Sequence, residues 1–226
     1  MTVPPDCQHR GLLIVVEGLD RSGKSSQCQR LVEYFQSNGK KVRYVKFPDR
    51  TTPTGQMINS YLTGQAQQDD HSIHLLFSAN RWEAINGIQA DIMNGVNVIV
   101  DRYSFSGAVY SAAKDNPDLS LDWAWYPEIG LFKPDLLFFL DISSTDASTR
   151  GGYGSERYET EKMQARVRAL FNELFTRLDG VSVHVINAGR TMDEVANDIQ
   201  ATVLQLSPTN TVLGQLQKLG PLLAEE

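Results

Sequence analysis

Five short runs of mainly apolar residues recur along the chain, separated by longer stretches of mixed polarity. The runs cover residues 12–17, 42–47, 96–101, 135–141 and 181–187. Because each run is nearly continuous in its apolar character, the pattern is typical of strands covered on both faces in a parallel sheet. Apolar residues at helical spacing between the runs predict helices over residues 24–37, 54–63, 70–93, 105–114, 160–178 and 192–206.

The segment over residues 70–93 is the longest predicted helix. Its apolar face consists of Leu76, Ala79, Trp82, Ile85, Ile88 and Ile92. Gly39 and Gly95 follow two of the predicted helices, where glycine commonly ends a helix. Strands that alternate with helices predict an α/β fold, a doubly wound five-stranded parallel sheet with helices on both faces. We expect a single domain over residues 1–226, with its core over about residues 12–206.

The composition is that of a globular protein. The chain has 226 residues, enough for one α/β domain with a substantial core. Apolar residues make up 41% and charged residues 21%, which argues against a disordered chain. The net charge of −6 argues against broad binding to nucleic acids or anionic membranes, which needs a basic surface. We therefore expect no nucleic acid and no membrane among the partners.

The two cysteines, Cys7 and Cys28, have no spacing that resembles a metal site or a disulfide framework. Residues 1–11 lack the charged and then apolar pattern of a signal peptide. The apolar run that follows them is too short to span a bilayer. These features favour an intracellular, cytoplasmic protein, with a nuclear location left open.

A glycine-rich loop, Gly-Leu-Asp-Arg-Ser-Gly-Lys-Ser, follows the first predicted strand at residues 18–25. It matches the pattern G-x-x-x-x-G-K-S/T and stands between a strand and a helix, as a phosphate-binding loop requires. In such a loop, backbone N–H groups and the helix N-terminus bind phosphate oxygens. The residues that we expect to bind ATP in this way are Gly18, Ser22, Gly23 and Ser26. We expect Lys24 to bridge the β- and γ-phosphates and the Ser25 hydroxyl to hold Mg²⁺. The weaker alternative is that this segment is a strand–turn–helix connection that binds no ligand.

A Mg²⁺–nucleotide site also needs a carboxylate at the end of a neighbouring strand. Asp101 and Asp141 both end predicted strands. Asp101 is followed at once by Arg102 and Tyr103, so cation-binding and phosphate-binding groups emerge together where doubly wound sheets hold ligands. We therefore predict Asp101 and Ser25 as metal ligands, and a place near a helix start for Asp141.

Arginines gather near the ends of predicted strands and the starts of predicted helices. They are Arg50, Arg81, Arg102, Arg150 and Arg157. Together with Arg21 and Lys24 they indicate a cleft that holds more negative charge than one triphosphate carries. The sequence has no N-K-x-D segment, with which GTPases recognise guanine.

Six segments together resemble the thymidylate kinase family, and its eukaryotic-type enzymes in particular: EGLDRSGKSSQ, KFPDRTTPTG, LFSANRWE, DRYSFSGAVYS, LDWAWYPEIGLFKPD and GSERYE. The resemblance covers about residues 12–206. It implies a P-loop nucleoside monophosphate kinase fold that transfers the γ-phosphoryl group of ATP to dTMP, with Mg²⁺ as cofactor. The products would be dTDP and ADP, a step in dTTP biosynthesis. The resemblance also implies a homodimer.

The resemblance assigns side chains to dTMP. Arg102 and Arg50 would clamp its phosphate, since a guanidinium favours bidentate recognition. Phe77 would stack on thymine, and Arg81 would bond the edge of the base. Asp20 would accept a hydrogen bond from the 3′-hydroxyl. The other acceptor-site residues that it implies are Phe47, Pro48, Ser106, Tyr110 on the far wall, and Tyr158 where a ribose 2′-hydroxyl would sit.

The resemblance also assigns side chains to ATP. Arg21 would reach the γ-phosphoryl group as an arginine finger from the loop itself, so that the catalytic residues would be Arg21, Lys24, Asp101 and Arg102. Residues 150–158 resemble the family's lid, in which Arg150 would stack on adenine. The segment Asn-Ala-Gly-Arg-Thr would contact the adenine edge through Asn187, Gly189 and Arg190.

Two other functions fit parts of the pattern. A deoxyribonucleoside kinase acting on thymidine shares the fold. Phosphorylating a 5′-hydroxyl calls for a carboxylate base, however, typically from a Glu-Arg pair where this chain has Asp101 and Arg102. A non-catalytic nucleotide-binding protein would not need a base pocket and a lid. Residues 1–11 and 207–226 have no predicted function, and the leucines of the second segment indicate a tail that packs onto the fold.

Overall fold

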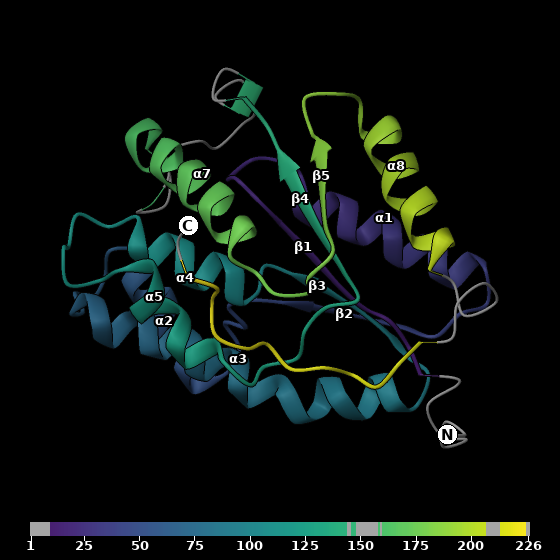
Figure 1. Cartoon of the computed structure of the whole chain (residues 1–226), viewed down its shortest axis with the longest axis horizontal. Coiled ribbons are helices and arrows are strands. Elements are labelled where there is room, and N and C mark those ends of the chain that lie inside the picture. Colours follow the sequence, from purple (N-terminus) through teal and green to yellow (C-terminus); the bar gives the residue numbers. More distant parts are fainter. Residues whose placement is uncertain (1–9, 144–145, 148–157, 159, 207–212, 225–226) are drawn as a thin grey trace.

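A five-stranded parallel sheet forms the centre of the molecule (Figure 1). The computed structural model describes residues 10–143, 146–147, 158, 160–206 and 213–224. The strands are β1 (Leu13–Gly18), β2 (Val42–Lys46), β3 (Asn97–Asp101), β4 (Leu136–Asp141) and β5 (Val183–Asn187), in the order β2-β3-β1-β4-β5. Every pairing is parallel. The predicted fold class and its five strands are therefore confirmed.

Strand β1 lies in the middle of the sheet, and the chain extends the sheet from it in both directions. It forms β2 and β3 on one side of β1, and then β4 and β5 on the other. Val16 of β1 pairs with Asp101 of β3, and Gly18 pairs with Leu140 of β4. The carboxyl ends of three neighbouring strands therefore meet where the strand order reverses, which is where such sheets hold ligands.

The central and edge strands differ in burial. β1 and β3 are buried at every position, and β4 at all but its last. In β2 only Val45 is buried, and in β5 only Ile186, while Val185 of β5 is 62% exposed. The expectation that all five strands are covered on both faces is therefore wrong for the edge strands, because a strand at the rim has fewer neighbours to cover it.

Helices cover both faces of the sheet, as predicted (Figure 1). α1 (Lys24–Ser37) and α8 (Met192–Gln205) pack together on one face. On the other face α4 (Ser104–Ala112) packs against both α3 (Asp70–Met93) and α7 (Glu161–Thr176), and α2 (Pro53–Leu62) packs against α3. Two short helices, α5 (Leu121–Trp125) and η2 (Tyr126–Glu128), are absent from the prediction. Among the described residues, no helix combines the length and the apolar character needed to cross a membrane.

Helix α3 buries different kinds of side chain along its two halves. Of the predicted apolar face, Ile85, Ile88 and Ile92 are buried, whereas Leu76 and Ala79 are half-buried and Trp82 is 39% exposed. The Trp82 indole donates a hydrogen bond to the Pro127 carbonyl at 2.8 Å. In the first half, the buried side chains other than Ile73 are polar, and Arg81 is among them. The predicted apolar face is therefore wrong for that half, because it borders the cavity described below.

The carboxyl-terminal residues 213–224 pack onto the body of the protein, as expected, but they form no helix. The Leu219 N–H donates a hydrogen bond to the Leu131 carbonyl at 2.7 Å, and the Leu219 side chain is buried. The indole of the buried Trp125 donates to the Gly220 carbonyl at 2.8 Å. The tail is therefore part of the folded core rather than an appendage.

Candidate functional site

A cavity of about 810 Å³ lies at the carboxyl ends of β1 and β3. Its walls come from the glycine-rich loop, the segment after β2, and helices α3 and α4. The predicted site residues that line it are Asp20, Arg21, Gly23, Lys24, Ser25, Ser26, Phe47, Pro48, Arg50, Phe77, Arg81, Asp101, Arg102, Ser106, Tyr110 and Tyr158. The fold thus gathers into one cavity side chains that are far apart in the sequence.

The loop after β1 has the backbone shape of a phosphate-binding loop. Gly18 and Gly23 have φ angles of 149° and 90°, which residues with a side chain rarely adopt. A Cβ on Gly18 would lie 2.5 Å from the Leu140 carbonyl oxygen. Gly23 caps the N-terminus of α1, and Ser22 is buried beside it. The N-terminus of α1, with its partial positive charge, therefore lies at the cavity.

Lys24 turns its ammonium group back into the loop. Its Nζ donates hydrogen bonds to the carbonyl oxygens of Leu19 at 2.6 Å and Gly18 at 3.1 Å, and the residue is buried. Burial, and then the charge of nearby Arg102, lower the pKa of Lys24 to about 8. An anion beside it would favour the charged form again. Lys24 is therefore placed to respond to a bound phosphate.

Ser25 and Asp101 lie side by side at the junction of the loop and β3. The Ser25 hydroxyl donates a hydrogen bond to Asp101 Oδ2 at 2.5 Å, and the Tyr44 hydroxyl donates to the same oxygen at 2.8 Å. Asp141, by contrast, pairs with Arg168 of α7 at 3.1 Å. Mg²⁺ prefers oxygen ligands and usually takes one or two carboxylates together with phosphates and waters. Ser25 and Asp101 fit such an ion.

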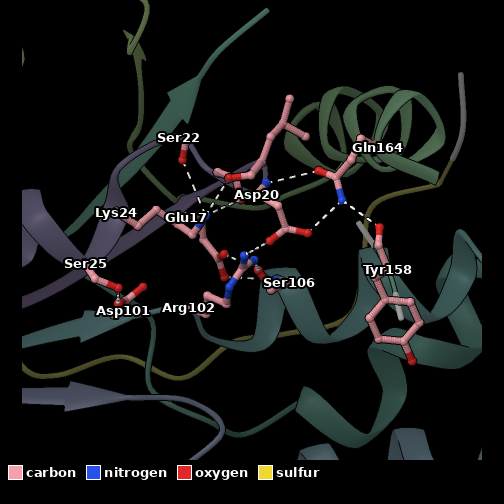
Figure 2. Close-up of polar contacts among 12 residues, drawn as sticks. Glu17, Asp20, Ser22, Lys24, Ser25, Asp101, Arg102, Ser106, Tyr158 and Gln164 are labelled. Atoms are coloured by element: carbon pink, nitrogen blue, oxygen red, sulfur yellow. Dashed lines mark hydrogen bonds and ion pairs between the residues drawn. The ribbon is translucent and has the colours of Figure 1, made fainter. Parts of the chain in front are cut away.

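Arg102 follows Asp101 but faces the opposite part of the site (Figure 2). Its φ of 66° is left-handed, which is uncommon for a residue with a side chain and often marks a functional site. Its guanidinium forms an ion pair with Asp20, donates to the Ser106 hydroxyl at 3.3 Å, and lies 5.2 Å from the centre of the Tyr110 ring. Two adjacent residues thus present a carboxylate and a guanidinium to different parts of the cavity.

Glu17 is a fully buried carboxylate that the sequence analysis does not single out. It accepts hydrogen bonds from the Tyr103 N–H at 2.8 Å, the Ser106 N–H at 2.9 Å and the Ser106 hydroxyl. Burial raises the pKa of Glu17, although the Ser106 hydrogen bonds oppose the shift. From β1, Glu17 therefore caps the start of α4 and holds the segment that carries Arg102. Its signal in the sequence is a carboxylate that ends an otherwise apolar run.

Gln164 of α7 is a second functional candidate that sequence reasoning misses. Its Oε1 accepts a hydrogen bond from the Asp20 N–H at 3.0 Å, and its Nε2 donates to Asp20 Oδ2 at 2.7 Å and to the Tyr158 carbonyl at 3.0 Å (Figure 2). Burial acts to raise the pKa of Asp20, but the charges of Arg102 and Lys24 outweigh it and the pKa is lowered. Gln164 therefore orients an ionised Asp20. Because α7 is remote from the loop in sequence, no local pattern indicates this contact.

The wall formed by α3 and α4 combines aromatic rings with a fixed guanidinium. Phe77, Arg81 and Tyr110 line it. Arg81 Nε and Nη2 donate to the two carboxylate oxygens of Glu128 at 2.7 Å and 2.5 Å, and both side chains are buried. This bidentate pairing sets the plane of the guanidinium. Glu128 belongs to η2, so its role escapes the sequence analysis.

The remaining acceptor-side candidates also lie at the cavity. Phe47 and Pro48 follow β2 directly, and Phe47 is buried. Arg50 donates a hydrogen bond to the Asn59 side chain at 2.9 Å. Tyr158, the described residue of the predicted lid, lines the cavity as well.

The candidates for adenine binding are not grouped in the same way. Asn187 ends β5 and accepts a hydrogen bond from the Gly189 N–H at 2.9 Å, while Arg190 pairs with Asp198 of α8. None of these residues is among the described residues that line the cavity. Arg150 and Arg157 lie outside the described residues. Adenine binding therefore stays a prediction.

Comparison with known proteins identifies the family. The sequence profile of "Thymidylate kinase" matches residues 16–199, more than half of the chain. The chain belongs to the thymidylate kinase family. The "Thymidylate kinase" of Danio rerio is 45% identical, covering 94% of this chain and 97% of that protein. That of Homo sapiens is 41% identical, covering 92% and 98%. The solved thymidylate kinase of Candida albicans has a TM-score of 0.83 at 36% identity, covering 93% of this chain and 99% of that one.

Membership of the thymidylate kinase family confirms the resemblance drawn from the sequence and the P-loop kinase fold that it implies. The cavity of this family member has two parts that suit anions. One is the N-terminus of α1 with the ammonium group of Lys24, and the other is the guanidinium of Arg102. Such an arrangement suits the positioning and charge stabilisation on which phosphoryl transfer depends.

Proposed function

We propose that the chain catalyses the ATP-dependent phosphorylation of dTMP to dTDP. Relatives named thymidylate kinase, at 45% and 41% identity over nearly their full length, support this activity. The observation that carries the proposal is that one cavity contains two cationic groups from different elements, Lys24 of the loop and Arg102 after β3. Family membership does not favour the alternative of a deoxyribonucleoside kinase acting on thymidine.

In the proposed reaction an oxygen of the dTMP phosphate attacks the γ-phosphorus of ATP in line with the leaving group. The bond between the γ-phosphorus and the β,γ-bridging oxygen breaks, and ADP leaves with the electron pair. Because the attacking oxygen is already anionic near neutral pH, no strong general base is required. The main obstacle is repulsion between two polyanions, which Arg21, Lys24 and Arg102 would offset.

On the acceptor side, we assign the dTMP phosphate to Arg102 and Arg50 and the 3′-hydroxyl to Asp20. The ion pair between Arg102 and Asp20 supports this assignment, because it keeps both groups ionised and close together. Phe77 would stack on the base and Arg81 would bond its edge. The other proposed acceptor contacts come from Phe47, Pro48, Ser106, Tyr110 and Tyr158.

On the donor side, we assign the triphosphate to the loop from Gly18 to Ser26, and adenine to Arg150, Asn187, Gly189 and Arg190. The Ser25 hydroxyl and the Asp101 carboxylate would hold Mg²⁺, because both are oxygen ligands and they lie side by side at the cavity. When bound, Mg²⁺ neutralises charge on the β- and γ-phosphate oxygens.

We also propose a single domain with a lid over residues 150–158, and an intracellular homodimer located in the cytoplasm or also in the nucleus. Leu75 and Trp82 lie two turns apart on α3 and are 48% and 39% exposed. Their exposure leaves this part of α3 accessible to a second copy of the chain. Light scattering coupled to size-exclusion chromatography distinguishes the mass of a dimer from that of a monomer.

The activity is tested by following ADP release from Mg–ATP with dTMP, thymidine, UMP and CMP as acceptors. We expect dTMP to react far faster than the other three. Arg102→Ala should lower turnover about 10³-fold or more, the effect of removing an arginine that stabilises a transferring phosphoryl group. Activity on thymidine but not on dTMP would instead indicate the nucleoside kinase. A folded protein that binds ATP but phosphorylates none of the acceptors would indicate a non-catalytic nucleotide binder.

A further inference from the structure

Gly107 of α4 lies directly beside the Arg81 guanidinium in the wall of the cavity. A Cβ on Gly107 would lie 2.8 Å from Arg81 Cζ and 2.9 Å from Nη1, and closer still to Nη2. A carbon atom in a folded protein does not come this close to a heavy atom to which it is not bonded, because non-bonded atoms pack at van der Waals distances. The guanidinium therefore occupies the space that any side chain at position 107 would need.

Arg81 is not free to move aside. Its Nε and Nη2 bonds to Glu128, at 2.7 Å and 2.5 Å, hold the guanidinium in a fixed plane. The Arg81 and Glu128 side chains are only 3% and 0% exposed. Separating a buried ion pair leaves an uncompensated charge, which is strongly unfavourable. A larger residue at position 107 must therefore displace a group that the structure holds firmly.

The backbone conformation at position 107 does not require a glycine. Gly107 lies inside α4, and its N–H donates the helical hydrogen bond to the Tyr103 carbonyl at 3.2 Å. Glycine in a helix interior is less favourable than alanine, so its presence there usually has a packing reason. Gly87 of α3 provides the contrast, because a Cβ there would meet only Arg43 Nη1, at an ordinary 3.4 Å. The steric reason at Gly107 is therefore not shared by Gly87.

We propose that Gly107 is a specificity-determining position for the acceptor base. Its missing Cβ allows the Arg81 guanidinium, held by Glu128, to reach the cavity wall where it selects the base. This inference rests on the proposed function, because it takes the cavity to be the site of a deoxynucleoside monophosphate.

The selection follows from the chemistry of the guanidinium, which donates hydrogen bonds and cannot accept them. Two of its five N–H groups go to Glu128, and the others remain for a ligand in the cavity. Thymine presents the O4 carbonyl, an acceptor, at the position where cytosine presents an amino group, a donor. A fixed Arg81 therefore favours dTMP over dCMP, and a displaced Arg81 loses that preference.

Gly107→Ala tests the inference, with Gly87→Ala as the matched control. The measured quantities are the dissociation constants of dTMP and dCMP by isothermal titration calorimetry. We expect Gly107→Ala to weaken dTMP binding about tenfold or more, the usual effect of losing a hydrogen bond to a charged group. Binding of dCMP should stay within about twofold, because dCMP does not use that bond. Gly87→Ala should leave both constants unchanged and raise the melting temperature, since alanine favours the helix.

A second background keeps the test decisive if Gly107→Ala does not fold. Arg81→Met combined with Glu128→Met removes both charges of the buried pair, an exchange that proteins often tolerate. In this background the guanidinium that clashes with the new Cβ is absent. Adding Gly107→Ala should then change neither dissociation constant and should not lower the melting temperature.

Three results would overturn the inference. They are unchanged dTMP affinity in folded Gly107→Ala, a parallel loss of dTMP and dCMP affinity, and the same loss in the background without Arg81. Wild-type protein that binds dTMP and dCMP equally well would overturn it too. Failure of the proposed function has a different signature, because wild-type protein would then transfer no phosphoryl group to dTMP, whatever its binding preference.

Discussion

The charge of Lys24 is expected to change when a nucleotide binds. Burial, and then the Arg102 charge, lower its pKa to about 8 against the weaker opposing effects of Asp20 and Asp101. From that value, about nine-tenths of the free protein carries a neutral Lys24 at pH 9 and about one-tenth at pH 7. Phosphate oxygens beside the ammonium group favour its charged form, so binding should return the pKa well above 9.

Nucleotide binding should therefore take up about 0.9 proton at pH 9 and about 0.1 proton at pH 7. The sign follows from linkage. Because the complex binds more protons than the free protein, affinity must fall as the pH rises through the pKa of free Lys24. The apparent dissociation constant should be about tenfold weaker at pH 9 than at pH 7.

Titration calorimetry with a non-hydrolysable Mg–ATP analogue, in two buffers of different ionisation enthalpy at each pH, gives the proton uptake directly. Other groups near the cavity should contribute little. Burial lowers the pKa of His74 to about 3, and burial raises the pKa of Tyr110. Lys24→Arg is the matched control, because it keeps the charge but does not titrate in this range. Uptake below about 0.2 proton at pH 9, or equal uptake in Lys24→Arg, would refute the reasoning.

Two further predictions concern Gln164 and the carboxyl-terminal tail. Gln164→Met removes the three hydrogen bonds that orient Asp20 and Tyr158. Steady-state kinetics should therefore show a KM for dTMP about tenfold higher, with little change in the KM for ATP. The exposed Lys162→Met on the same helix should have neither effect, and equal changes for both substrates in Gln164→Met would contradict the assignment. Leu219→Ala should lower the free energy of unfolding by about 2–5 kcal/mol in urea titrations while leaving turnover unchanged. A loss below about 0.5 kcal/mol would mean that the tail contributes little to the core.

The sequence alone predicts the sheet, the six main helices and the centre of the site. Lys24, Ser25 and Asp101 are predictable because a strand–loop–helix motif and a strand-ending carboxylate must meet at the same edge of a parallel sheet. Buried strands leave continuous apolar runs and amphipathic helices leave periodic patterns, and both signals survive in a single sequence. The short helices α5 and η2 do not, since five and three residues are too few to show a helical period.

The groups that hold the site in place are harder to predict. Gln164 and Glu128 contact Asp20 and Arg81 from elements that are distant in sequence, and neither belongs to a local motif. Their roles depend on how helices pack, which a periodic pattern does not specify. Glu17 is intermediate, because its position at the end of an apolar run is visible, although its partners on α4 are not.

In the proposed site, the hydrogen bonds between β1 and the segment after β3 would also set the distance between the two substrates. The Arg102 N–H donates to the Val16 carbonyl at 3.1 Å, and Glu17 accepts from the backbone at the start of α4. The next residue, Gly18, begins the loop that carries Lys24. The spacing between donor and acceptor would then depend on β1 and β3, two strands that are buried at every position. A substitution that loosens β1 against β3 would weaken recognition of both substrates together, whereas changes in the surrounding loops would affect them one at a time.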